Sequence, residues 1–361
     1  LIKHVMPALQ SYARGAGFEA VLSEMRFGIR KSLGEDHKTT EVCMAELQRC
    51  IETSAGLCYM LLSCDRYGFR APPRRIPACD MDGMMARSTA DERDIALEYY
   101  ALDENELCTP QECYSISVNM HGAFNVAGHA YILRNVGSVP NFWNRFPLLQ
   151  SALRNAAERH WPHAASTHLR DPQSQHPVKF FFFSITEEEM SRGLFWRDTT
   201  QVPSSVHVFL RTLQSPGGGG LQQMPVGAPE LKNYIDLSSD KTTADLDAAR
   251  LLVEQQHMIS LSLSQAPSCL TAFPPLQWRD NQGVDPSHPQ HAAYLQKFAE
   301  AALARLLNSI DGARERLAVE PHAGMAEAIF HLKFAEHRAK RFAHTTETDL
   351  VTAKLRGYLA S

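Results

Sequence analysis

The stretch YSISVNMHGAFNVAGHAYIL, residues 114–133, carries the pattern that decides the fold. Apolar and polar side chains alternate along 114–120, as they do in a strand that buries one face. A second strand is predicted over 126–133, and Gly122 and Asn125 favour a turn between the two strands. The stretch therefore predicts an antiparallel hairpin at the centre of the chain.

Helical patterns lie on both sides of this predicted hairpin. Apolar residues recur at steps of three and four up to about residue 65, and the same spacing returns from residue 242 onward. Two further strands are predicted at 178–185 and 206–213. Strands and helices are grouped instead of alternating, which favours the α+β class over a doubly wound parallel sheet.

This grouping divides the chain into three predicted regions. Residues 1–110 are predicted to be mainly helical, 111–216 to form the antiparallel β-rich region, and 217–361 to be mainly helical and packed on the rest. A serine and a proline followed by the four glycines of 217–220 are typical of a linker. We place the second boundary at this glycine run.

The composition excludes several classes of protein. The chain has 361 residues with 44% hydrophobic and 21% charged side chains, which is ordinary for a globular protein. Its net charge of −4 disfavours a protein dedicated to nucleic acids, because such proteins carry a basic excess. The longest apolar runs are far shorter than a membrane-spanning helix. We therefore expect no transmembrane segment, while peripheral contact with a membrane stays open.

Cysteine usage and the N-terminal charge bear on the cellular compartment. Seven of the eight cysteines lie between Cys43 and Cys113, partly on a predicted helix, and free thiols are expected of them. Residues 1–31 hold five Lys or Arg against two Glu, and the chain begins at Leu1 without an initiator methionine. These features fit the mature end of a mitochondrial precursor, although a trimmed or cytoplasmic protein has the same pattern.

Motifs that fix a chemistry are absent from the sequence. It contains no G-x-x-x-x-G-K-[ST] loop, no G-x-S-x-G turn, no C-x-x-C pair and no H-E-x-x-H helix. Four histidines of one polar stretch could gather on zinc, but they lack rigid spacing and acidic partners. They are His160, His163, His168 and His176. We accordingly predict no catalytic residue, no metal site and no cofactor.

Two histidines next to the predicted hairpin turn form a candidate ligand pair. His121 and His129 would face each other across the strands if the hairpin closes between them. Such a pair could hold a ligand or titrate near neutral pH, because the pKa of histidine lies there. The alternative is a pair of hydrogen-bonded, half-buried residues without a further role.

A cationic stripe is predicted on a helix near the C-terminus. Its residues are spaced i, i+4, i+7 and i+11, which places them on one helical face. They are Lys333, His337, Lys340 and His344. Such a face could contact phosphate groups, anionic lipid head groups or an acidic protein surface, and the alternative is a solvated exterior.

Two aromatic clusters fall in segments without a clear period. One contains Phe142 and Trp143, and the other contains Phe195 and Trp196. Exposed aromatic side chains could dock a partner protein, whereas buried ones would cover the core from a loop.

The absence of catalytic motifs and the long connecting segments favour an accessory role. We predict a non-catalytic structural subunit of a large organellar assembly, of the mitochondrial respiratory or ATP-synthase type, with other protein subunits as partners. One alternative is an enzyme whose site assembles near His121 and His129. The other is a self-associating viral or shell protein.

Overall fold

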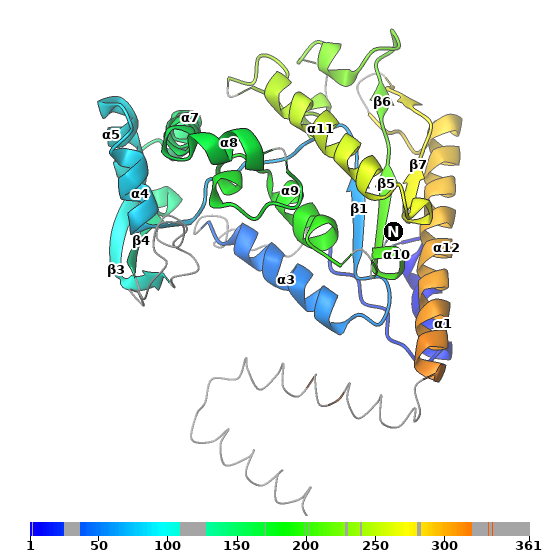
Figure 1. Ribbon diagram of the computed structural model, residues 1–361. Helices are drawn as coiled ribbons and strands as arrows, with labels where there is room; N and C mark the ends of the chain where they lie inside the picture. Colours follow the sequence, from blue (N-terminus) through cyan, green and yellow to red (C-terminus); the bar gives the residue numbers. More distant parts are fainter. Residues whose placement is uncertain are drawn as a thin grey trace, which may run out of the picture. The chain divides into compact units, whose positions relative to one another are not determined.

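A computed structural model describes most of the chain (Figure 1). The described residues are 1, 3–24, 37–108, 128–169, 171–198, 200, 202–227, 230–238, 240–279, 283–319, 331 and 334. They belong to two compact units, Leu1–Ser309 and Ile310–Ser361. The second unit holds the end of the last described helix, and the first unit holds the sheets and cavities described below.

Helices and strands both contribute to the first unit, which confirms the predicted α+β class. The strands are β1 (Tyr59–Ser63), β2 (Arg75–Pro77), β3 (Tyr100–Cys108), β4 (Gly128–Leu133), β5 (Val206–Leu210), β6 (Leu213–Gln214), β7 (Leu270–Ala272) and β8 (Leu276–Gln277). The α-helices are α1 (Met6–Gly15), α3 (Thr39–Thr53), α4 (Ala78–Met85), α5 (Ala90–Tyr99), α7 (Phe142–His160), α8 (Pro162–His168), α9 (Ile185–Met190), α10 (Val202–Ser205), α11 (Leu246–Ser262) and α12 (Pro289–Val319). The shorter helical turns are η1 (Val136–Ser138), η2 (Pro177–Phe181), the π-helical η3 (Ser191–Phe195), η4 (Leu221–Gln223), η5 (Leu231–Asn233) and η6 (Pro267–Cys269).

An antiparallel sheet lies close to where the sequence predicts one. Its strand order is β2-β4-β3, and β3 has an irregularity in register between Asp103 and Leu107. Helices α4, α5 and α7 pack on it, and α5 begins with a capping box between Thr89 and Glu92. The predicted partner strand at 114–120 lies outside the described residues, so the predicted hairpin stays a prediction.

A parallel sheet of order β1-β5-β7 brings together segments that are far apart in the sequence. Val206 and Val208 of β5 point into one core, which they share with Ile259 of α11. Phe209 points to the opposite face and packs with Ala302 of α12. Because neighbouring residues of a strand face opposite sides, helices cover both faces of this sheet. In Figure 1, α11 and α12 lie on either side of β5.

Three sequence-based predictions of secondary structure are wrong. The apolar run 178–185 is η2 and the start of α9, because Ser184 caps the helix by accepting the N–H of Glu187. The helix predicted to reach residue 62 ends at Thr53 and is followed by β1. Residues 18–24 are not helical. Short apolar runs fit a buried helix and a buried strand equally well, so their period does not separate the two.

No described helix combines the length and the apolar character needed to span a bilayer. Cys43, Cys50, Cys58, Cys64 and Cys269 are free thiols.

Candidate functional site

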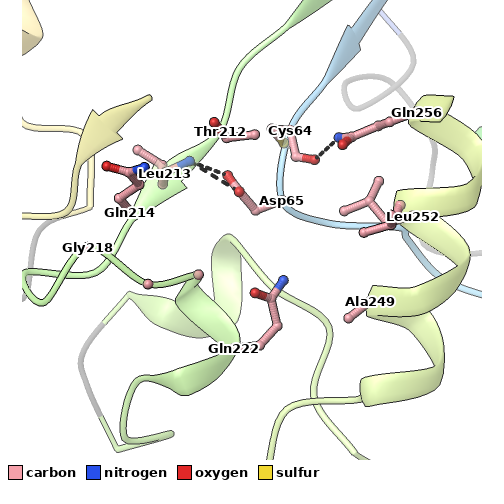
Figure 2. Close-up of a pocket in the computed structure, with 13 residues that line it drawn as sticks. Cys64, Asp65, Thr212, Leu213, Gln214, Gly218, Gln222, Ala249, Leu252 and Gln256 are labelled. Carbon is pink, nitrogen blue, oxygen red and sulfur yellow. Dashed lines mark hydrogen bonds between the residues drawn. The ribbon is translucent and has the colours of Figure 1, made fainter. Parts of the chain in front are cut away.

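A cavity of about 260 Å³ lies where β1 and β5 of the parallel sheet end (Figure 2). Cys64 and Asp65 directly follow β1, and Thr212 follows β5 by two residues. Helix α11 closes one wall with Leu252 and Gln256. The carboxyl ends of parallel strands are the edge at which ligands commonly bind in α/β sheets. The first candidate site is therefore this strand-end cavity.

Asp65 brings a carboxyl group to the strand-end cavity. Its two oxygens accept the N–H of Leu213 at 3.1 and 3.0 Å. Burial raises the pKa of Asp65 to about 6, and the Leu213 N–H and the charge of Arg211 offset part of this rise. A carboxyl group in such surroundings can bind a cation or take up a proton not far below neutral pH.

Gln256 holds the end of β1 in place beside Asp65. Its Nε2 donates to the carbonyl of Cys64 at 3.0 Å and to the hydroxyl of Ser63 at 3.2 Å. In Figure 2 this amide reaches from α11 toward Cys64, while Gln222 extends into the space below Asp65. Polar groups from three separate elements therefore meet around one space.

The glycine run forms a tight turn at the edge of this cavity. Gly218 N–H donates to the carbonyl of Ser215 at 2.8 Å, and Ser215 N–H donates to the carbonyl of Gly219 at 2.7 Å. Pro216 takes the second position of the turn, and Gly218 has a φ of +83°, which glycine adopts readily. Residues 215–219 thus form a hydrogen-bonded turn, and the region boundary predicted at the glycine run stays a prediction.

A second cavity, of about 450 Å³, lies between the segment 71–77 and α9. Two ion pairs line it, Arg192 with Glu188 at 2.8 Å and Arg74 with Glu41 at 3.1 Å. It differs in this respect from the strand-end cavity, where the described residues supply no ion-pair partner for Asp65.

Helix α9 carries three consecutive glutamates, of which Glu187 and Glu188 are buried and Glu189 is half-buried. Glu187 accepts a hydrogen bond from the hydroxyl of Tyr67, and Glu188 pairs with Arg192. Burial raises the pKa of Glu187 and of Glu189 to about 7. These carboxyl groups make the stability of the fold depend on pH near neutrality.

The predicted aromatic docking residues have different surroundings. Phe142 and Phe195 are buried in two cores with 3% and 2% of their surface exposed, so the prediction that they dock a partner is wrong. Trp196 is half-buried, and its indole N–H donates to the carbonyl of Pro172 at 3.1 Å. Trp143 is 54% exposed on α7, and its docking role stays a prediction.

Trp143 has an exposed aromatic neighbour that the sequence does not reveal. Phe69 is 48% exposed, and its ring lies 6.4 Å from that of Trp143 and stacks on Phe146 at 5.7 Å. The next residue, Arg70, accepts a hydrogen bond from Gln150 through its carbonyl, which fixes this segment along α7. The Phe69–Trp143 surface is the second candidate site.

The predicted histidine pair and cationic stripe are largely outside the described residues. His129 is exposed on β4, opposite Leu107, whereas His121 is not described. The stripe of Lys333, His337, Lys340 and His344 is not described either. No group of three or more metal-ligating side chains occurs in the described ranges. Of the zinc candidates, His168 and His176 stack with their ring centroids 4.9 Å apart.

Sequence reasoning missed the strand-end cavity entirely. Asp65 follows a strand that was predicted as part of a helix, so its place at a sheet edge had no sequence signal. Thr212 lay inside the strand predicted at 206–213, whereas β5 ends at Leu210, so its place after the strand end had no sequence signal either.

Comparisons with known proteins give partial relatives. The chain is 26% identical over 305 residues to NACHT domain- and WD repeat-containing protein 1 of Mus musculus. The matched region covers 83% of this chain and 17% of the mouse protein. It is 32% identical over 130 residues to the Homo sapiens protein of the same name, which covers 32% of this chain and 8% of the human protein. The chain therefore spans less than a fifth of the length of these curated relatives.

No family model matches the chain, and no solved structure matches it.

Proposed function

We propose that the chain acts as a non-catalytic protein-interaction segment of a multidomain protein, with the Phe69–Trp143 surface as its docking site. The partial relatives support the setting, because the matched segment is 17% of a mouse protein whose name gives it a NACHT domain and WD repeats. The proposal keeps the accessory role and the protein partners expected from the sequence.

The observation that carries this proposal is the exposure of two adjacent aromatic rings. Large aromatic side chains contribute much of the binding energy at protein interfaces, most of all when neighbouring residues hold them rigidly. Trp143 sits on a helix whose buried face includes Phe142 and Phe146, and its ring lies 5.1 and 5.2 Å from theirs. Both exposed rings are thus presented in fixed positions.

Affinity purification of tagged wild type and variants from cells of the source organism tests the proposal. We expect Trp143→Ser to lose a partner protein that wild type retains, since the indole would fill a pocket on that partner. Leu148→Ser is the matched control, because Leu148 is 53% exposed on the same helix but falls on a different side of it. Retention of every partner by Trp143→Ser, with its circular dichroism unchanged, would refute the proposal.

The same purification separates the alternatives. If the chain is a self-associating shell protein, the tagged wild type would co-purify untagged copies of the same chain. The tagged Trp143→Ser variant would not co-purify them. The mitochondrial location expected from the N-terminal charge stays a prediction, and fractionation of the same cells tests it.

A further inference from the structure

The carboxylate of half-buried Asp65 is the one charged group among the described residues that line the strand-end cavity, and the charge of Arg211 nearby favours its ionised form. Its oxygens share one peptide N–H, from Leu213, and the described residues give it no ion pair. Buried carboxylates are usually paired or accept several hydrogen bonds, because leaving water costs them much of their solvation. The nearby guanidinium of Arg211 lies over the ring of Tyr234, 5.8 Å from its centroid, instead of on Asp65.

The rest of the cavity wall is neutral. Cys64, Thr212 and Gln222 offer a thiol, a hydroxyl and an amide, while Leu213 and Leu252 are apolar. None of the described lining residues is Lys or Arg. An anionic ligand would therefore be repelled by Asp65 in the wall, with Arg211 nearby but outside the lining, whereas a cationic group would meet its counter-charge in the wall.

We propose that the strand-end cavity binds a small organic cation, with its ammonium group paired to Asp65 and its apolar body against Leu252. The volume of about 260 Å³ lies just below the range of about 300–1,000 Å³ usual for drug-sized ligands, so the occupant is compact. Gln222 and the hydroxyl of Thr212 give the remaining polar contacts. This proposal does not rest on the Phe69–Trp143 surface.

Benzylamine and n-butylamine are the probes, with benzyl alcohol and benzoate as neutral and anionic counterparts. Binding to the full chain is measured by calorimetry and by the rate at which iodoacetamide alkylates Cys64, followed by peptide mass spectrometry. Cys64 lines the cavity, so an occupant should slow its alkylation. Cys50 lies on α3 and serves as the internal control, whose rate should not change.

Two variants make the result specific to the cavity. Asp65→Asn should weaken amine binding by about tenfold or more, because it removes the charge and keeps an oxygen for the Leu213 N–H. Val253→Trp should block the cavity, because Val253 lines it and is 66% exposed, so a larger side chain fits without disturbing the core. Amine binding that protects Cys64 and is lost in both variants supports the proposal.

The proposal is overturned if neither amine binds the folded wild type. It is also overturned if benzyl alcohol or benzoate binds as tightly as benzylamine, or if Asp65→Asn leaves amine affinity unchanged.

Discussion

The two three-stranded sheets differ in how the chain builds them. The antiparallel sheet takes its strands from residues between 75 and 133, whereas the parallel sheet collects strands from residues 59 to 272. Along β4, the exposed His129 precedes the buried Ala130, but four consecutive residues of β5 are buried. Local pairing with one solvated face leaves an alternating pattern in the sequence, and a sheet covered on both faces does not.

The difference also bears on folding and on the cavity. Distant strands must meet before the parallel sheet exists, and closing such long loops is slow. The strand-end cavity can form only after these strands pair, since its walls come from the segments that follow β1 and β5 and from α11. Of the predictions that follow, the two alanine substitutions in the cores test whether the two sheets unfold as one body.

Removing a buried side chain beside the parallel sheet should have the largest effect. Ile259 of α11 is fully buried against β5, so Ile259→Ala should lower the free energy of unfolding by about 2–5 kcal/mol. Leu261→Ala on the same helix is the control, because Leu261 is 60% exposed and its loss should cost within about 0.5 kcal/mol. Urea unfolding followed by circular dichroism measures both.

Leu149→Ala makes the same test in the core of the antiparallel sheet, where Leu149 is fully buried on α7. If residues 1–309 unfold as one cooperative body, Leu149→Ala and Ile259→Ala shift the same single transition. Two transitions, each moved by one of these variants, would show that the two sheets are independent.

Two buried tyrosines should respond differently to loss of the hydroxyl group. Tyr67 donates to the carboxyl group of Glu187, and Tyr67→Phe should cost about 1–3 kcal/mol because that buried group loses a partner. Tyr99 donates to the carbonyl of Phe142 at 2.7 Å, a neutral acceptor, and Tyr99→Phe should cost about 0.5–1.5 kcal/mol. Equal losses in urea unfolding would contradict this ranking.

The buried glutamates of α9 should make stability fall as the pH rises toward neutrality. Burial raises the pKa of Glu187 and Glu189 from 4.5 to about 7, so the folded state holds protons that the unfolded state has released. Their contribution is full below about pH 4.5 and is lost as the pH rises through 7. Within that window, each of the two groups lowers the free energy of unfolding by at most about 1.4 kcal/mol per pH unit.

Buried histidines act in the opposite direction and must be separated. Burial lowers the pKa of His176 and His207 to about 4, so their contribution is present above pH 6.5 and is lost as the pH falls. The measurement is therefore the difference between wild type and the double variant Glu187→Gln/Glu189→Gln in urea unfolding from pH 4.5 to 7.5. If this difference in the free energy of unfolding does not change with pH, the raised pKa of Glu187 and Glu189 is refuted.

The sequence predicted the parts of the fold that depend on local signals. The strand predicted at 206–213 is found at 206–210, and the helices α11 and α12 fall in the region predicted to be helical, since their signals come from neighbouring residues. The strand β1 was missed because its pairing with β5 joins residues about 150 apart, and no local pattern records that pairing.

The candidate sites were predictable only in part. Trp143 was expected at the surface, but its neighbour Phe69 comes from a segment 74 positions earlier in the chain. For Phe195 the sequence left an exposed and a buried ring equally open, and η3 turns the ring into the core. Asp65 lines the strand-end cavity because it lies at the edge of the parallel sheet, and that edge exists only in the tertiary structure.

The smallest effect should come from the turn that borders the strand-end cavity. Gly218 has a φ of +83° and nothing within 4 Å of where a Cβ would lie, so Gly218→Ala meets a backbone penalty of about 1 kcal/mol and no clash. Gly217 has the same open surroundings without a positive φ, and Gly217→Ala should be within about 0.5 kcal/mol of wild type. A true linker would tolerate both changes equally, because its backbone would not be held in one conformation. A measured difference between these two alanine variants in urea unfolding thus decides whether the glycine run is part of the folded parallel-sheet region.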